Sequence, residues 1–173
     1  ALDLRSDGKA SIDGIVTTTA DGTLGAAGDI DVRGTVQAGG ALTVTGGANT
    51  TLGGTLVSAG DLALGNANGA FGSTGTLQSG GKLSIDAAKT IDLGNGRTSV
   101  LGASVNAKAG GNAVLHDMTA ASAIDVDAAG QLNTTGTLVS NGTLALHAGQ
   151  DLHQDGTLQS QDDMLLESRG GSL

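Results

Sequence analysis

The residues of this sequence that could carry chemistry are its carboxylates and its three histidines. There are 17 acidic residues against 8 basic ones, which gives a formal net charge of −9 at pH 7. A polysaccharide-cleaving site would need two carboxylates held at a fixed separation. Asp125 and Asp127 are the best candidates, but the residues twenty positions later, one period of the repeat described below, are Ala145 and His147. No acidic column forms, so the sequence predicts that the chain is not an enzyme.

The histidines are too dispersed for a metal site. Zinc is held by three or four convergent ligands, whereas this chain has no cysteine, and His116, His147 and His153 occupy different positions of the repeat. We expect His147 and His153 to be surface residues and the chain to bind no metal and no cofactor.

The charge balance excludes nucleic acid as a partner. Binding to phosphates needs a basic stripe, and stacking of bases needs aromatic side chains, of which Phe71 is the only one. The acids are scattered over corners and outward strand positions, where they predict a solvated surface that resists side-by-side association. No apolar run has the length needed to span a bilayer, so no membrane insertion is expected.

A period of about twenty residues organises nearly the whole chain. The lettering Gly-Thr-Leu-x-Ser opens at Gly136 and at Gly156, and related openings occur at Gly75, Gly54, Gly34 and loosely at Gly14. An aliphatic residue follows two positions after the opening, in a column that includes Val36, Leu56, Leu77, Met118, Leu138 and Leu158. A second column includes Leu42, Leu62, Leu83, Ile124, Leu144 and Met164.

Within each unit, apolar and polar residues alternate as they do in β-strands. Two such strands are followed by a third that is shorter and less regular, and Phe71 and Val114 are among its apolar residues expected to point inward. Glycine pairs such as Gly39-Gly40 and Gly80-Gly81 mark corners, where a positive φ or a close backbone approach favours glycine. Helix is disfavoured because Gly, Thr, Asn, Ser and Asp dominate between the aliphatics.

Strands this short cannot bury their own apolar faces, but they can do so if the chain winds as a solenoid. We therefore predict an all-β fold, a right-handed parallel β-helix of about eight rungs, each of roughly 20 residues with three short strands. Equivalent aliphatics such as Leu138 and Leu158 then lie about 4.8 Å apart in neighbouring rungs. The two columns above form the predicted structural ladder.

The chain is interpreted as a single β-helical segment covering residues 1–173, with a degenerate rung around 94–111. The 61 residues between Gly75 and Gly136 fit three rungs, but the opening Gly-Thr-Leu is lost there. A corner insertion is the favoured explanation, and a binding protrusion is the alternative. Because the chain starts in the middle of a rung, we expect an excised piece of a longer shaft, whose open edges allow end-to-end association.

Gly-Thr-Leu-x-Ser alternating with x-Leu-x-Leu-x-Ala-Gly-x-Asp-Leu is clearest over 136–152 and recurs over 54–64 and 75–85. This pattern resembles the haemagglutinin repeats of filamentous-haemagglutinin-type exoproteins, and the resemblance covers essentially the whole chain. Those proteins are very large bacterial surface proteins, secreted by the two-partner route, and they include adhesins and contact-dependent growth inhibition effectors.

The resemblance implies a right-handed β-helical shaft, secreted to the bacterial cell surface, that extends a distal binding region. It also implies an outer-membrane transporter as partner during secretion, and a host- or target-cell receptor or glycan bound through the parent protein. The family's secretion domain carries Asn-Pro motifs, whereas this chain has no proline, so a part of the shaft is expected. One alternative is a carbohydrate- or receptor-binding module that acts directly in adhesion, and a remote one is a polysaccharide-cleaving β-helix enzyme.

Overall fold

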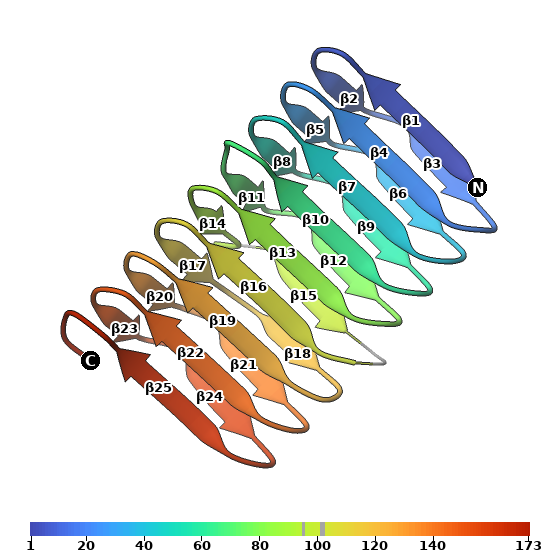
Figure 1. The fold of residues 1–173 in the computed structure, drawn as a ribbon. Coiled ribbons are helices and arrows are strands. Elements are labelled where there is room, and N and C mark those ends of the chain that lie inside the picture. Colours follow the sequence, from blue (N-terminus) through green and yellow to red (C-terminus); the bar gives the residue numbers. More distant parts are fainter. Residues whose placement is uncertain (95, 101–102) are drawn as a thin grey trace.

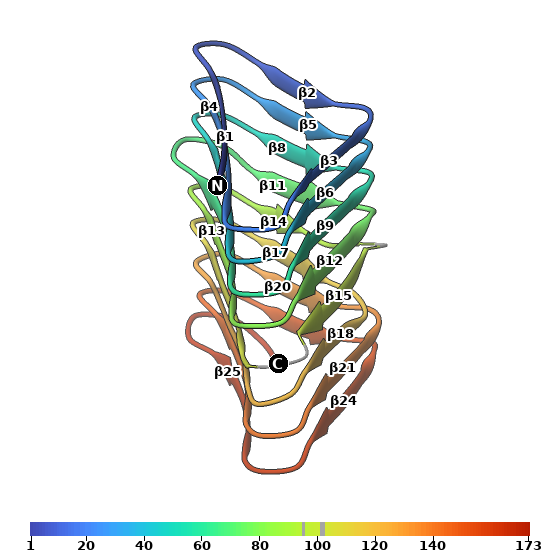
Figure 2. The ribbon, with the colours of Figure 1, turned by 90° about the vertical axis from the view of Figure 1, so that its right-hand side faces the viewer.

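The structure is a computed structural model that describes residues 1–94, 96–100 and 103–173. All regular secondary structure in these ranges is β-strand, and no helix is found there. Figure 1 shows the strands stacked turn upon turn from the N-terminal to the C-terminal end, and Figure 2 shows that each turn is bounded by three strands on three different faces. The strands form three sheets, here named A, B and C.

Sheet A has nine strands and contains the second aliphatic column. Its strands are each five residues long: β1 (Leu2–Ser6), β4 (Gly22–Ala26), β7 (Leu42–Gly46), β10 (Leu62–Asn66), β13 (Leu83–Ala87), β16 (Val105–Ala109), β19 (Ile124–Ala128), β22 (Leu144–Ala148) and β25 (Met164–Ser168). Side chains in these strands alternate between the interior and the outer surface. In β7, for example, Leu42, Val44 and Gly46 are buried, whereas the two threonines between them are exposed.

Sheet B has eight strands and is built from the short third strand of each unit. Its strands are β2 (Ala10–Ile12), β5 (Ile30–Val32), β8 (Thr50–Leu52), β11 (Phe71–Ser73), β14 (Ile91–Asp92), β17 (Ala113–Leu115), β20 (Leu132–Thr134) and β23 (Leu152–Gln154). Phe71 lies inside the solenoid with 1% of its surface exposed, opposite Thr50 on one neighbouring turn and Ile91 on the other. The one aromatic ring is therefore accommodated beside smaller neighbours.

Sheet C has eight strands and contains the Gly-Thr-Leu openings. Its strands are β3 (Ile15–Thr18), β6 (Thr35–Ala38), β9 (Thr55–Ser58), β12 (Thr76–Ser79), β15 (Arg97–Val100), β18 (Met118–Ala120), β21 (Thr137–Ser140) and β24 (Thr157–Ser160). The serines at the ends of several of these strands point inward and hydrogen-bond the corners. Oγ of Ser79 donates to the carbonyl of Gly60 at 3.0 Å, and Oγ of Ser140 donates to that of Ser122 at 2.9 Å.

Every strand pairs in parallel with its equivalent one turn away. Leu138 lies opposite Leu158, and Leu144 lies opposite Met164. These pairings confirm the predicted all-β parallel solenoid, with about eight turns of ~20 residues and three sheets. Its handedness stays a prediction.

The opening glycines are required by close approach of neighbouring turns. A Cβ built on Gly54 overlaps the carbonyl oxygen of Gly34, and one built on Gly75 overlaps that of Gly54. Among the described residues no glycine has a positive φ, so of the two reasons considered for glycine at corners, close approach is the one that applies. Consecutive turns can therefore stack at strand spacing across this corner.

The register changes in the middle of the chain, and one expectation there was wrong. Along sheet B, Ile91 pairs with Ala113 and Ala113 with Leu132, so the steps are 22 and 19 residues instead of 20. As a result Ala113 and Leu115 are buried, and Val114, which was placed inside from the sequence, faces outward and is half-buried. The proposed degenerate rung around 94–111 includes residues 95, 101 and 102, which lie outside the described residues.

Candidate functional site

The two aliphatic columns lie inside the solenoid. Ten of the twelve residues assigned to the ladder have at most 2% of their surface exposed: Val36, Leu42, Leu56, Leu62, Leu77, Leu83, Met118, Ile124, Leu138 and Leu144. The other two lie on the last described turn, which has a neighbouring turn on one side only. Leu158 is half-buried against the core, and Met164 is 44% exposed.

Several corner acids hold adjacent turns together, a role that their interpretation as a solvated surface missed. Oδ1 of Asp61 accepts a hydrogen bond from the backbone N–H of Lys82 at 2.8 Å, and Oδ1 of Asp117 accepts one from Thr137 at 3.0 Å. The same contact is made by Asp21, Asp29, Asn49, Asn112 and Asp151 with the equivalent position one turn later. These side chains satisfy backbone donors at corners, where strand pairing ends.

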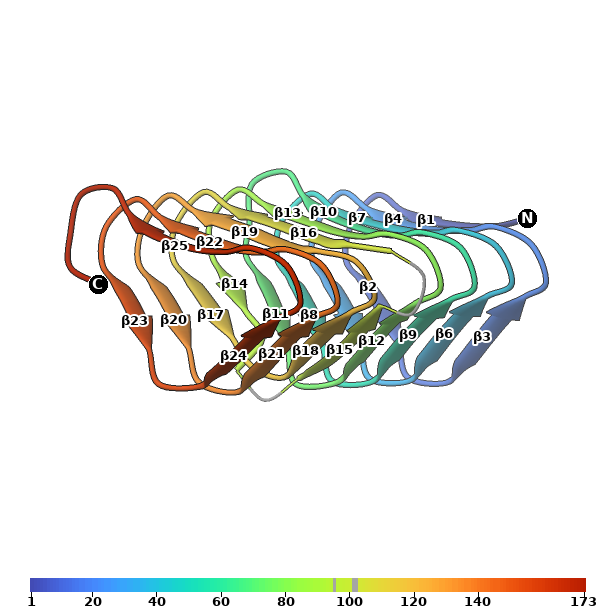
Figure 3. The ribbon, with the colours of Figure 1, turned by 90° about the horizontal axis from the view of Figure 1, so that it is seen from below.

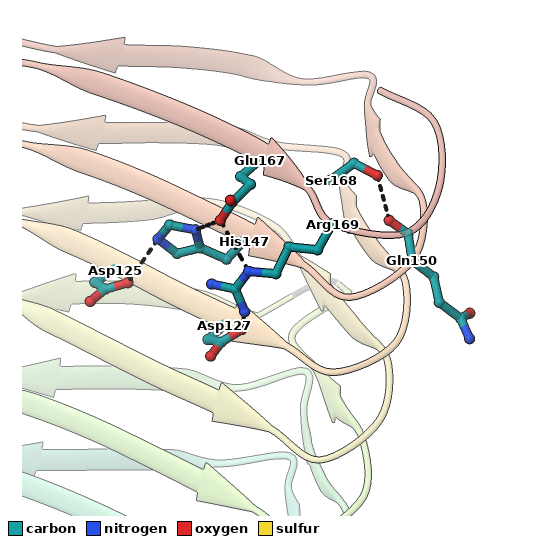
Figure 4. Close-up of polar contacts among 7 residues, drawn as sticks. All are labelled: Asp125, Asp127, His147, Gln150, Glu167, Ser168 and Arg169. Atoms are coloured by element: carbon teal, nitrogen blue, oxygen red, sulfur yellow. Dashed lines mark hydrogen bonds and ion pairs between the residues drawn. The ribbon is translucent and has the colours of Figure 1, made fainter.

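The densest polar cluster lies on the outer surface of sheet A, at its C-terminal end (Figure 4). It consists of Asp125 and Asp127 on β19, His147 on β22, Glu167 on β25 and Arg169 just after β25. Strand pairing places Asp127, His147 and Glu167 at equivalent positions of three consecutive turns. The solenoid thus brings together side chains that lie twenty and forty residues apart in the sequence.

The side chains of this cluster contact one another across neighbouring turns. Nδ1 of His147 lies 2.8 Å from Oε2 of Glu167, and its Nε2 lies 4.0 Å from Oδ1 of Asp125. Arg169 donates from Nε to Glu167 at 3.0 Å and from Nη1 to Asp127 at 3.2 Å, so it spans two turns. Asp125, Asp127 and Glu167 therefore each have a histidine or arginine neighbour within the cluster.

The pKa values in the cluster follow from these contacts. The hydrogen bond from His147, and after it the one from Arg169, holds the pKa of Glu167 below its ordinary value of 4.5. The hydrogen bond to Glu167 in turn raises the pKa of Arg169 above its ordinary value. A similar pair lies near the other end of the solenoid, where Asp31 and then Asp13 raise the pKa of Arg33.

Glu167→Gln will reduce stability at neutral pH, and the difference from the unchanged chain will disappear in acid. A carboxyl whose folded pKa is depressed stabilises the fold above its unfolded pKa and loses this effect as the pH falls through the folded value. The Tm difference between the two chains should therefore shrink below about pH 4.5. Thermal unfolding followed by circular dichroism at pH 7 and pH 3 measures it.

Asp162→Asn is the matched control. Asp162 is an exposed acid that precedes β25, the strand of Glu167, and it stands outside the cluster. Its Tm difference from the unchanged chain should vary less between the two pH values. A Glu167→Gln difference that stayed the same at pH 3 and pH 7 would contradict the ion-paired geometry.

No group of three or more His, Cys, Asp or Glu side chains that could hold a metal ion is found in the described residues. His116 lies 3.6 Å from the carboxylate of Asp117, and His153 lies 3.0 Å from that of Asp155, so each of these histidines has one acidic neighbour. Sequence reasoning treated His147 as a simple surface residue and missed the cluster. The twenty-residue spacing of Asp127, His147 and Glu167 was the signal that could have revealed it.

Comparison with protein families decides what kind of segment this is. The model of the haemagglutinin repeat family matches residues 1–66, 53–122 and 104–172, which together cover nearly all of the chain. The chain belongs to the haemagglutinin-repeat family. Haemagglutinin repeats are typically structural and non-catalytic. Their family is one of secreted exoproteins and is associated with adhesins.

The family and the geometry agree on a β-helix segment of haemagglutinin repeats. No significant match was found among the curated proteins or among the solved structures. Within the described ranges, the chain contains no helix with the length and apolar character of a membrane span.

Proposed function

We propose that this chain is a structural shaft segment of a large secreted bacterial surface protein, either an adhesin or a contact-dependent inhibition protein. Its role is to extend a distal binding region from the cell surface. The observation that supports the proposal is the stacking itself: each strand of the three sheets pairs only with its equivalents on adjacent turns. Such a stack can be lengthened by adding turns without changing the contacts of those already present.

The proposed mechanism is geometric. Each turn adds about 4.8 Å along the axis, so about eight turns give a rod on the order of 40 Å long. Leu56, Leu77 and their equivalents are buried in the interior, and close packing of this kind makes the rod resist compression and bending. Repetition of one unit therefore provides distance from the cell surface.

The partners proposed for the parent protein follow from the family. Passage through an outer-membrane transporter requires an unfolded chain, and the absence of cysteine agrees with this because no disulfide can form before export. We propose that a receptor or glycan on a host or target cell is bound through the distal region. We expect the chain to bind no nucleic acid and not to insert into a membrane.

Deleting one complete turn, residues 136–155, tests the spacer role. Thr137 pairs with Thr157 and Leu144 with Met164, so the deletion joins equivalent positions and removes β21, β22 and β23 together. We expect the β-rich circular dichroism spectrum to persist and the maximum dimension in small-angle scattering to fall by about 5 Å. In the parent protein, secretion should be retained.

A deletion of residues 136–145, about half a turn, is the matched control. It removes β21 and part of β22, so the strands that follow lose their equivalents on the preceding turn and the last turn should not stack. If the complete-turn deletion abolished cell binding while a complete-turn deletion elsewhere in the shaft did not, the spacer role would be wrong. Saturable binding of the isolated chain on a glycan array would instead support the direct binding module.

A further inference from the structure

The three outer faces of the solenoid differ in charge. Charged outward side chains on the strands of sheet A include Asp3, Arg5, Asp86, Lys108, Asp125, Asp127 and Glu167, and those on sheet B include Asp31 and Asp92. Arg97 is the single charged residue on the described strands of sheet C. Sheet C therefore forms a nearly neutral surface on a chain whose net charge is −9.

The outer surface of sheet C is here named the neutral face, and its N-terminal half includes the outward residues of β6, β9 and β12. Strand register places them in two columns, one of Thr35, Thr55 and Thr76 and the other of Gln37, Val57 and Gln78. The same types recur on β21 and β24 as Thr137, Val139, Thr157 and Gln159. Figure 3 shows the strands of sheet C side by side in one row along the rod.

We propose that the neutral face binds the neutral face of a second copy of this chain, so that two rods associate side by side. Two chains with a charge of −9 each repel one another wherever their acids would meet. On the neutral face Arg97 is the single charged residue of the described strands, so few like charges are brought together there. Glutamine amides both donate and accept hydrogen bonds, and threonine hydroxyls do the same, so the surface is complementary to itself.

The area of sheet C makes this association weak. A strand of four residues is about 13 Å long, and eight strands at about 4.8 Å spacing extend over about 38 Å. The face thus covers about 500 Å² on each partner, so about 1,000 Å² in total would be buried, which is the lower limit for a specific interface. A longer stack with the same outward residues would bury proportionally more, so affinity should rise with the number of turns.

The repulsion between the two chains makes the association salt-dependent. The acids of sheets A and B and of the corners remain exposed in such a dimer, and their long-range repulsion is screened as ionic strength rises. The dimer should therefore be favoured by added salt, opposite to the behaviour of an interface that is held by ion pairs.

Sedimentation velocity of the 173-residue chain tests the proposal, at protein concentrations up to about 1 mM and at NaCl concentrations of about 0.05 and 0.5 M. We expect a reversible dimer that is stronger at high salt. The double variant Gln37→Glu/Gln78→Glu places like charges in the interface and should raise the dissociation constant by about tenfold or more. Circular dichroism verifies that the variants are folded.

Thr23→Glu/Ala63→Glu is the matched control, because it adds the same charge at the same two-turn spacing on the outer surface of sheet A. It should leave the dimer unchanged at high salt. A chain that stays monomeric in both salts, a dimer that resists the glutamine substitutions, as end-to-end association would, or equal weakening by both double variants would overturn the proposal. None of these results affects the shaft role, which depends on stacking within one chain.

Discussion

Replacing Leu138 with alanine should lower the free energy of unfolding by about 3 kcal/mol. Leu138 is fully buried, and strand pairing places it between Met118 on the preceding turn and Leu158 on the following one. Truncation removes apolar contacts with both neighbours and leaves a cavity that the flanking turns cannot fill without losing their strand register. Urea unfolding followed by far-ultraviolet circular dichroism measures the loss, because the chain has no tryptophan or tyrosine.

Val139→Ala is the control for this experiment. Val139 is the next residue along β21, but it points outward and is half-buried. Its truncation should cost less than about 1 kcal/mol. Equal losses for the two substitutions would contradict the inward column and with it the stacked fold.

Gly54→Ala should be about as damaging, with an expected loss of about 3 kcal/mol. The added methyl group overlaps the backbone carbonyl oxygen of Gly34 on the preceding turn. A backbone atom cannot move aside as a flexible side chain can, and the same corner also holds the hydrogen bond from Thr55 N–H to the Gly34 carbonyl at 2.9 Å. The two turns must therefore separate locally, which weakens sheet C on both sides.

Gly53 provides an adjacent comparison. A Cβ on Gly53 meets no atom within 4 Å, and its φ is not positive. Gly53→Ala should therefore be neutral, or stabilising by up to about 1 kcal/mol, because alanine restricts the unfolded chain. If Gly53→Ala destabilised the protein as much as Gly54→Ala, flexibility of the corner and not close approach would be what the glycines provide.

The stacked fold could be predicted because its main determinants repeat in the sequence. Leu138 and Leu158 stand at the same position of consecutive units, and the alternation around each gives the strand period directly. In a solenoid the equivalent residues of adjacent units are also neighbours in space. A sequence column is therefore a column of contacts, which is not true of an ordinary globular domain.

The prediction failed where the period changes. Val114 has the right residue type for the interior, but the 22-residue step from Ile91 to Ala113 moves it to the outer surface. An insertion at a corner leaves no alternation of its own, so either Val114 or its two neighbours could have been placed inside. Only the pairing of Ala113 with Leu132 distinguishes these possibilities.

The polar contacts between turns could not be predicted from the sequence either. Asp61 and Asp117 look like any exposed acids at turns, and their hydrogen bonds to Lys82 and Thr137 depend on a side-chain rotamer and a corner shape that composition does not specify. Arg169 contacts Asp127 across two turns. The repeat length aligns residues at the same position of each unit. Arg169 and Asp127 are 42 residues apart and stand at different positions of the unit, so the repeat does not reveal their contact.

The strand pairing between turns has a mechanical consequence. The backbone hydrogen bonds of all three sheets join one turn to the next, so they are directed along the rod and not across it. A pull on the two ends loads the junctions between turns in series. The hydrogen bonds of one junction share the force, and every junction bears the full force. The rod should therefore fail by peeling at its weakest junction while the other turns remain folded, and its tensile strength should not increase with its length.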